Sequence, residues 1–255
     1  MKPLAIDLFC GLGGWTEGLL LEGYEVIGFD IERHDYGDGM RYPAQLVLQD
    51  VMTMVGSQFK GAALIVASPP CQAYSYRAMP WKRAKALPPP SNELFDACFR
   101  IQREAIEAAG RFIPMVVENV RGAQPWVGRS RWNYGSFHLW GDVPALMPMV
   151  ARGALKQGVC HSADGATNFH GRKNDGGSWF NVAHNTTSGK GQNPDGRLSD
   201  DGTKLGGSWF HGYAKGKGPR NHGSKSQKRK AASAAIAKIP LPLSRHIGAY
   251  WYPRP

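Results

Sequence analysis

Cys71 is the residue of this chain whose type and setting point most directly to chemistry. It closes the run Ser68-Pro69-Pro70-Cys71, which follows the apolar segment 62–67, a predicted buried strand. Proline lacks the N–H that a paired strand needs, so the chain should turn out at the strand's carboxyl end, where open α/β sheets bind ligands. A partly exposed thiol there can ionise to the nucleophilic thiolate. A buried structural cysteine, the commoner state of a lone cysteine, is the alternative that this position leaves open.

A glycine-rich turn near the start of the chain predicts a binding site. The segment 4–9 reads as a buried strand, the turn 10–14 (Cys-Gly-Leu-Gly-Gly) follows, and 15–20 has a helical pattern. Glycine lets a ligand approach the backbone closely. A second strand, 24–29, ends at Asp30, the position where nucleoside-binding α/β domains accept hydrogen bonds from ribose. This order predicts a nucleoside site, although the glycine spacing differs from the dinucleotide pattern and an ordinary tight turn is the alternative.

A carboxylate is predicted at the same edge of the sheet as Cys71. The apolar segment 112–117 predicts another buried strand, and Glu118-Asn119-Val120 follows it. A glutamate after a strand is usually a solvated loop residue. A thiol and a carboxylate beside a nucleoside pocket are nevertheless the groups that thiolate attack on a pyrimidine ring requires. We therefore interpret these segments as one catalytic constellation.

Four motifs, taken in order, resemble those of the DNA cytosine-5 methyltransferases. They are Phe9-Cys10-Gly11-Leu12-Gly13-Gly14, Pro70-Cys71-Gln72, Glu118-Asn119-Val120 and Ile239-Pro240-Leu241-Pro242-Leu243. The resemblance covers roughly residues 1–148 and 231–255, and a short phage- or prophage-type member is the nearest likeness. It implies an α/β fold: a Rossmann-like S-adenosylmethionine-dependent methyltransferase domain with a small, loop-rich target-recognition domain.

The resemblance implies S-adenosylmethionine as the cofactor and assigns its contacts. Asp30 would bind the ribose, Ile31 would pack on the adenine, and Asp50 would meet the adenine amine. The full predicted cofactor set is Phe9, Gly11, Leu12, Gly13, Gly14, Asp30, Ile31, Asp50, Val51 and Pro70. The C-terminal motif departs from the family, because Ile236-Ala237 followed by Lys238 stands where members commonly carry a Gly-Asn pair.

The resemblance also implies the roles of the catalytic residues. The thiolate of Cys71 would add to C6 of cytosine, Glu118 would hydrogen-bond the N3 and amino edge, and C5 would take the methyl group. Arg131 would contact the flipped cytosine, with Arg129 as the other candidate. Phosphate contact or surface charge is the alternative for both arginines. The base must be flipped, because this chemistry cannot reach C6 inside a stacked duplex.

Basic and aromatic residues in the loop 73–90, among them Tyr74, predict a lid that closes over DNA, with a solvated basic loop as the alternative. The predicted DNA contacts are Gln72, Ser75, Tyr76, Arg77, Lys82, Arg83, Arg172, Lys228, Arg229 and Lys230. A formal net charge of +11 agrees with a polyanionic partner. We predict double-stranded DNA as that partner and a monomeric protein that needs no obligate protein partner.

The composition predicts two domains. Residues 151–230 hold 16 of the 32 glycines and few aliphatic residues, too little for a sizeable core. We therefore assign 149–230, with its basic linker, to target recognition, and 1–148 with 231–255 to catalysis and cofactor binding. The repeat Gly-Gly-Ser-Trp-Phe at 176–180 and 206–210 predicts paired hairpins around Trp179 and Trp209. Partial disorder of this region is the alternative.

The remaining patterns indicate the setting of the protein. The four cysteines show no close pairing, so neither a disulfide framework nor a zinc site is predicted, and no metal is expected. The chain shows no signal sequence and no long apolar run, which favours the cytoplasm of a bacterium or phage-infected host. A self-protective or restriction–modification role would suit such an enzyme.

Three other functions remain open from the sequence. The same scaffold would serve RNA cytosine-5 methylation. Lys238 near the methyl donor would favour carboxy-S-adenosylmethionine and carboxymethyl transfer. The chain would otherwise be a catalytically silent DNA-binding homologue, which the presence of both Cys71 and Glu118 argues against.

Overall fold

The computed structural model describes residues 2–37, 40–75, 88–147, 158–161, 167–171, 230–231, 234–235 and 237–253. The chain forms two compact units. One consists of Met1–Val150 with Lys238–Pro255, and the other of Ala151–Ala237. The role of residues 149–230 in target recognition stays a prediction.

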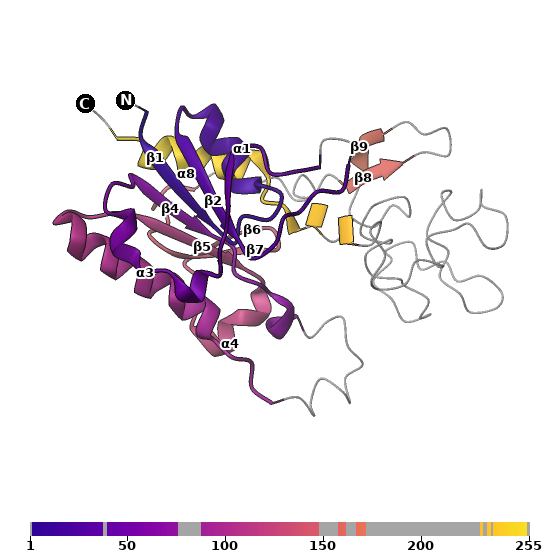
Figure 1. The fold of residues 1–255 in the computed structure, drawn as a ribbon. Coiled ribbons are helices and arrows are strands. Elements are labelled where there is room, and N and C mark those ends of the chain that lie inside the picture. Colours follow the sequence, from indigo (N-terminus) through magenta and orange to yellow (C-terminus); the bar gives the residue numbers. More distant parts are fainter. Residues whose placement is uncertain are drawn as a thin grey trace, which may run out of the picture. The chain divides into compact units, whose positions relative to one another are not determined.

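The first unit is built on a seven-stranded sheet with the order β3-β2-β1-β4-β5-β7-β6 (Figure 1). The strands are β1 (Leu4–Leu8), β2 (Glu25–Asp30), β3 (Gln45–Leu48), β4 (Leu64–Ala67), β5 (Met115–Asn119), β6 (Trp132–Tyr134) and β7 (Phe137–Gly141). The pairs among β1 to β5 are parallel, whereas β7 is antiparallel to both its neighbours. The strand order reverses between β1 and β4, which makes the fold Rossmann-like and places a ligand crevice at the carboxyl ends of these strands.

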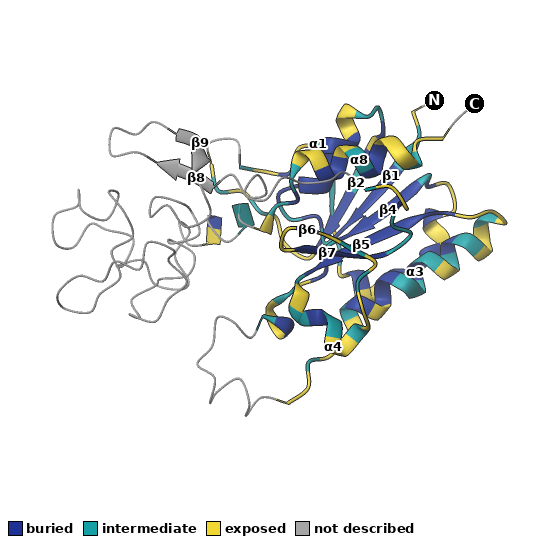
Figure 2. Ribbon diagram, turned by 180° about the vertical axis from the view of Figure 1, so that it is seen from behind, coloured by how far each residue is buried: buried dark blue, intermediate teal, exposed yellow. Residues whose placement is uncertain are grey.

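Apolar runs explain the central strands. Every residue of β4 and β5 is buried, as expected for parallel strands covered on both faces (Figure 2). The predicted strands at 4–9, 24–29, 62–67 and 112–117 are confirmed as β1, β2, β4 and β5. The last begins at Met115, after Pro114, which has no N–H for the ladder. Glu118 consequently lies within β5 rather than after it.

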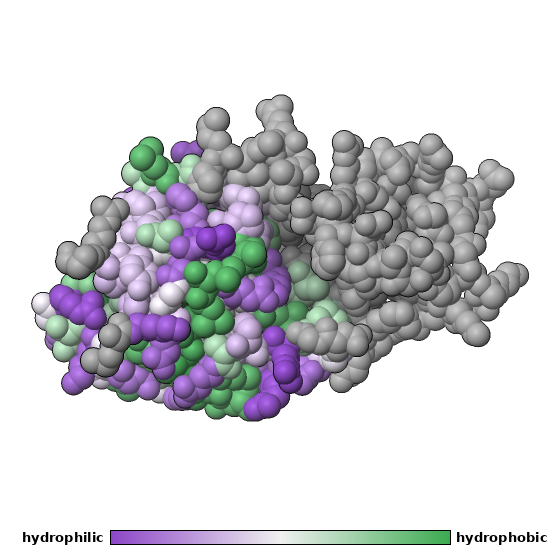
Figure 3. Space-filling view, turned by 90° about the horizontal axis from the view of Figure 1, so that it is seen from above, coloured by the Kyte–Doolittle hydropathy of each residue, from purple (hydrophilic) through white to green (hydrophobic). Residues whose placement is uncertain are grey.

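Helices cover both faces of the sheet (Figures 1 and 2). α1 (Gly14–Leu21) and α8 (Leu241–Trp251) pack together on one face, and α3 (Glu93–Ala109) covers the other. The short helices are η1 (Val51–Thr53), η2 (Gly56–Phe59), η3 (Gln72–Tyr74), η5 (Arg121–Ala123) and α4 (Gln124–Val127). Figure 3 views the side of α1 and α8, where apolar and polar surface are interspersed over the described residues.

The sequence of each helix explains which of its faces is buried. α3 buries Phe95, Cys98, Ile101 and Ala105, a helical spacing that forms one apolar stripe against the sheet. The predicted C-terminal helix is confirmed as α8, which begins directly after Pro240 and tolerates Pro242 in its first turn. No helix among the described residues is both long and apolar enough to cross a membrane.

The described residues of the second unit include a two-stranded antiparallel sheet. It pairs β8 (Gly158–His161) with β9 (Thr167–Gly171). The hairpins predicted around Trp179 and Trp209 lie outside the described residues.

Candidate active site

Strand register brings the predicted catalytic segments to one edge of the sheet. Ala67, the last residue of β4, pairs with Val117 of β5 in parallel register. The segment that follows β4, residues 68–75, therefore starts beside Glu118. We refer to this segment as the Cys71 loop. The sequence predicted this shared edge, and the strand pairing confirms it.

Two side chains anchor the start of the Cys71 loop. The buried amide of Asn119 donates a hydrogen bond to the carbonyl of Pro69 at 3.0 Å. The indole N–H of Trp15, in α1, donates to the hydroxyl of Ser68, also at 3.0 Å. The loop is thus tied to β5 on one side and to the helix after the glycine turn on the other. Asn119 has no role predicted from the sequence, although it adjoins the predicted catalytic glutamate.

Cys71 lies directly before η3, and its carbonyl accepts hydrogen bonds from the Tyr74 amide and the Ser75 hydroxyl. Of the cysteine side chains that the structure describes, Cys10 and Cys98 are buried, and burial raises the pKa of both thiols. Cys71 is half-buried. It is therefore the accessible thiol of the three, as a nucleophile must be.

Glu118 is 9% exposed and pairs with Leu139 of β7. Directly paired residues share one face of a sheet, and successive residues alternate between faces. Glu118 and Asn119 therefore occupy opposite faces, and Asn119 shares its face with its partner His138. β5 thus presents the carboxylate on one face while its next residue holds the Cys71 loop.

The glycine turn after β1 has an opening for a ligand. Phe9 has a φ of 56°, a left-handed conformation that a non-glycine residue adopts at a cost of roughly 1–3 kcal/mol and that clusters at functional sites. A Cβ added at Gly11 would meet no atom within 4 Å, so one side of the turn is open. Gly14 differs, because a Cβ there would collide with the backbone of Ile239. Gly14 serves helix packing, and Gly11 is the glycine that leaves room for a ligand.

Asp30 carries a negative charge beside this opening. Its Oδ2 accepts a hydrogen bond from the Gly11 amide at 2.9 Å, and its Oδ1 lies 3.5 Å from Nε2 of His34. Burial by itself raises the pKa of Asp30, but hydrogen bonds from His34, Gly11 and Glu32 outweigh it and hold the pKa below its usual value. An ionised carboxylate in this position can accept hydrogen bonds from ribose hydroxyls.

Exposed apolar side chains adjoin Asp30. Ile31 is 74% exposed, Leu48, the β3 partner of Asp30, is 52% exposed, and Met52 in η1 is 42% exposed. Such a surface suits the flat face of an adenine. Ile31 is among the predicted cofactor contacts, whereas Leu48 and Met52 are not. Their positions two residues before and two residues after the predicted contact Asp50 could have identified them.

Other predicted cofactor residues have different surroundings. Asp50 caps η1, and its Oδ1 accepts from the Met52 amide at 2.9 Å. The side chains of Val51 and Leu12 are buried, and that of Val51 packs in the core, so neither faces a ligand. Pro70 is exposed.

Lys238 precedes α8, and its Nζ lies 2.5 Å from Oε1 of Glu17 in α1. The positive charge that suggested carboxymethyl transfer therefore has an acid beside it.

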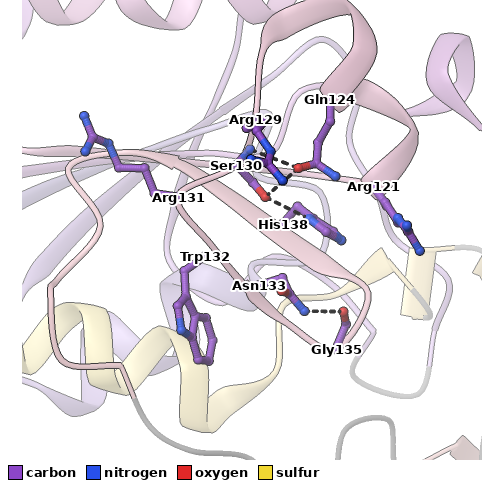
Figure 4. A pocket seen from close by; sticks show the side chains of 9 residues that line it. All are labelled: Arg121, Gln124, Arg129, Ser130, Arg131, Trp132, Asn133, Gly135 and His138. Atoms are coloured by element: carbon purple, nitrogen blue, oxygen red, sulfur yellow. Dashed lines mark hydrogen bonds between the residues drawn. The ribbon is translucent and has the colours of Figure 1, made fainter.

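The arginines predicted to contact cytosine line a pocket of about 570 Å³ (Figure 4). We call it the arginine pocket. It is lined by Arg121, Gln124, Arg129, Ser130, Arg131, Trp132, Asn133, Gly135 and His138. Figure 4 shows Arg129 and Arg121 on the side of His138, whereas the Arg131 side chain extends away from them. Arg129 and Arg131 thus point in different directions and do not form one contact surface.

The predicted lid is described only at its ends. Tyr74 is buried, and its hydroxyl donates to the side-chain oxygen of Asn92 at 2.9 Å. Closure of the loop 73–90 stays a prediction. Gln72 and Lys230 are exposed, and Ser75 is half-buried. The predicted DNA contacts Tyr76, Arg77, Lys82, Arg83, Arg172, Lys228 and Arg229 lie outside the described residues.

Comparison with known families identifies residues 4–124 as matching the C-5 cytosine-specific DNA methylases. The chain carries a C-5 cytosine-specific DNA methylase domain. The match spans the glycine turn, the Cys71 loop and Glu118, the three elements that meet at the sheet edge. A search among curated proteins finds no match.

Solved structures with a similar fold are remote in sequence. One is a DNA modification methyltransferase candidate encoded within an E. coli prophage, 20% identical, covering 50% of this chain and 35% of that chain, with a TM-score of 0.34. The S. pombe Dnmt2 methyltransferase is 17% identical over 49% of this chain and 36% of that chain, with a TM-score of 0.33. Entamoeba histolytica EhMeth is 16% identical over 50% of this chain and 41% of that chain, with a TM-score of 0.34. The chain thus spans well under half the length of these proteins.

C-5 cytosine methylases use S-adenosylmethionine as methyl donor, and this methylase domain has residues that fit it. The open side of Gly11, the ionised Asp30 and the exposed Ile31 and Leu48 would supply a cradle, a ribose acceptor and an adenine surface. These residues surround the carboxyl ends of β1 and β2, at the crevice that the strand order predicts.

Proposed function

We propose that this protein transfers a methyl group from S-adenosylmethionine to C5 of a cytosine flipped out of duplex DNA, through a covalent bond between Cys71 and C6. One observation carries the proposal. The Cys71 loop starts beside Glu118 at the ends of two neighbouring parallel strands, and Asn119 holds the loop by its hydrogen bond to Pro69. This arrangement supports the proposal because it would let a nucleophile and an acid act on one pyrimidine ring.

Cys71 and Glu118 divide the chemistry between them. The thiolate of Cys71 donates an electron pair to C6, forming the S–C6 bond and pushing the C5–C6 π electrons into the ring. Glu118, in its protonated form, donates a hydrogen bond to N3 and stabilises the negative charge that develops there, so that C5 becomes nucleophilic. S-adenosylmethionine would supply the electrophilic methyl group to C5 and leave as S-adenosylhomocysteine. A base then takes the C5 proton, which restores the C5–C6 double bond, and the S–C6 electron pair leaves with Cys71 as thiolate.

The substrate part of the proposal rests on charge and access. A net charge of +11 favours a polyanion. Attack on C6 needs the base outside the stack, so the loop 73–90, with Arg77, Lys82 and Arg83, is proposed to close over the extruded base and the DNA phosphates. Duplex DNA, rather than RNA, is our proposed substrate because the matching family is a DNA methylase family.

Nucleoside mass spectrometry tests this function. Purified protein is incubated with S-adenosylmethionine and unmethylated genomic DNA, and in parallel with unmodified RNA, and both are digested to nucleosides. We expect 5-methylcytosine in DNA, its loss in Cys71→Ala, and a rate lower by several orders of magnitude in Glu118→Gln. Cys98→Ala removes a buried thiol of α3 and serves as the matched control, which should stay active.

The RNA arm distinguishes the substrates. 5-Methylcytosine in RNA without any in DNA would overturn the DNA assignment while keeping the chemistry. Full methylation by Cys71→Ala would overturn the mechanism.

A further inference from the structure

The arginine pocket combines positive charge with a fixed polar floor. Three of its nine lining residues, Arg121, Arg129 and Arg131, are cationic, and none is acidic. Among the ion pairs formed by the described residues, none includes these arginines. Arg121 and Arg129 lie on the side of His138, and their like charges repel each other unless an anion lies between them. The pocket therefore has the charge of an anion site.

Hydrogen bonds fix the floor of the pocket. Oε1 of Gln124 accepts from both the backbone amide and the hydroxyl of Ser130, each at 3.2 Å. The backbone amide can only donate, so the atom that it meets must be the amide oxygen of Gln124. Because the Ser130 hydroxyl donates its proton to Gln124, its oxygen is left to accept from Nδ1 of His138 at 2.9 Å.

These hydrogen bonds determine which tautomer His138 adopts. Burial lowers its pKa, and the charge of Arg121 lowers it further, so the imidazole is neutral at neutral pH. With its proton on Nδ1, the ring leaves Nε2 as an acceptor. The floor is thus neutral and held in one orientation, and the positive charge comes from the arginines.

The pocket adjoins the catalytic edge. His138 pairs with Asn119, the residue that holds the Cys71 loop, and Gly135 lies in the turn that joins β6 to β7 at this same end of β5. Asn119 and His138 share the face opposite Glu118. A base held by Glu118 and an anion held near His138 would therefore lie on either side of one sheet edge.

We infer that Arg121 and Arg129, supported by the Gln124–Ser130–His138 chain, bind a backbone phosphate of the nucleic-acid strand that carries the target cytosine. The inference rests on the proposed nucleic-acid substrate. Guanidinium groups bind phosphate oxygens in pairs of hydrogen bonds, and Ser130 and His138 hold the floor against which the two arginines lie. Arg121 directly follows the Glu-Asn-Val motif. It is a new candidate contact, since it is not among the residues predicted from the sequence to bind DNA.

The salt dependence of DNA binding tests the inference. The association constant of the full-length protein for a mixed-sequence DNA duplex is measured over a range of salt concentrations. Each lost phosphate contact reduces the slope of log K against log salt by about 0.9. We expect Arg121→Gln to show this reduction and to bind about tenfold more weakly at low salt. Arg121 is exposed, so its replacement should not impair folding.

Arg103→Gln is the matched control. Arg103 is exposed on α3, outside the pocket, and its replacement removes the same charge. Its slope should stay at the wild-type value. Ser130→Ala, which removes no charge, should weaken binding by breaking the floor. Equal slopes for Arg121→Gln and the wild type would overturn the inference, as would failure of the wild type to bind either DNA or RNA.

The binding assay is independent of methyl transfer. A slope reduced in Arg121→Gln without any 5-methylcytosine formed by the wild type would keep the phosphate site and reject the proposed function. Methylation by the wild type together with an unchanged slope in Arg121→Gln would keep the proposed function and reject the phosphate site.

Discussion

The amide of Asn119 joins two segments that lie 50 residues apart, since it donates to the carbonyl of Pro69 in the Cys71 loop. Its own side-chain oxygen accepts from the Val120 amide at 2.8 Å, so both ends of the group are used. Asn119→Ala should leave the buried Pro69 carbonyl unsatisfied and cost about 1–3 kcal/mol of stability. A shift of the loop by about 1 Å would lower kcat roughly 100-fold.

Asn119→Asp provides the sharper variant at this position. It keeps the shape and the acceptor for Val120 but cannot donate to Pro69. Both variants should lose kcat while the KM for S-adenosylmethionine, measured in steady-state assays, stays near its wild-type value. Wild-type kcat in either variant would show that the bond does not position Cys71.

Asp7 gives the fold a dependence on pH. Its side chain is 0% exposed, Oδ2 accepts from Thr16 at 2.6 Å, and Oδ1 has no hydrogen-bond partner among the described residues. Burial raises the pKa of Asp7 to about 8. The folded protein therefore keeps a proton that the unfolded chain releases near its ordinary pKa of about 3.9.

The sign of this effect follows by linkage. The stability contributed by Asp7 is fully present below its unfolded pKa of about 3.9 and is lost as the pH rises from there to about 8, by at most about 1.4 kcal/mol per pH unit. Asp7→Asn cannot ionise, so the loss should be absent from its profile. Urea unfolding between acid pH and pH 8 measures both proteins, and parallel profiles would contradict the assignment.

The positions of Cys71, Glu118 and Asp30 in the fold could be predicted from the sequence, but the residues that hold the Cys71 loop could not. Cys71, Glu118 and Asp30 follow or end apolar runs, and the carboxyl ends of such strands meet at one edge of a parallel sheet. The bond from Asn119 to Pro69 depends on how two loops and a strand fit together. No local pattern specifies that fit.

At the scale of elements, glycine sets how closely α1 approaches the segment around α8. A Cβ at Gly18 would collide with the hydroxyl of Ser244, and Gly248 lies against Leu19. Two ion pairs lie along the same contact: Glu17 of α1 pairs with Lys238, which precedes α8, and Glu22, which follows α1, pairs with Arg245 of α8. The helix α1 begins directly after the glycine turn, so this contact also helps to hold the turn in place.

Gly18→Ala should destabilise the protein by about 1–3 kcal/mol, because overpacking outweighs the better helix propensity of alanine. Gly61→Ala is the matched control, since a Cβ at Gly61 would meet no atom within 4 Å. It should change the free energy of unfolding, measured in urea, by less than about 0.5 kcal/mol. Equal stability of the two variants would show that the α1 contact is not tight.

The elements differ in how far their sequences reveal them. β1, β2, β4 and β5 are apolar runs and were predicted, whereas β6 and β7 mix aromatic, polar and glycine residues and were not. These two strands are specified by antiparallel pairing at the sheet edge, a tertiary effect. α3 went unremarked although its buried residues recur at helical spacing.

At the scale of the whole molecule, the chain joins a methylase domain to a glycine-rich unit with a strong excess of positive charge. The first unit supplies the cofactor crevice, the Cys71 loop and the arginine pocket. Residues 149–230 are proposed to read the target sequence, and composition alone supports that role. Counterion release from the excess of Lys and Arg would then provide affinity without specificity.

Trapping with 5-fluorocytosine tests the central claim most directly, because fluorine at C5 blocks the final elimination. The protein is incubated with S-adenosylmethionine and duplex DNA containing 5-fluorocytosine, digested with protease, and the cross-linked peptide is identified by mass spectrometry. We predict one adduct, carrying an added methyl group, on the peptide that contains Cys71, and none in Cys71→Ala. An adduct on Cys10, Cys98 or Cys160, or its persistence in Cys71→Ala, would contradict the account.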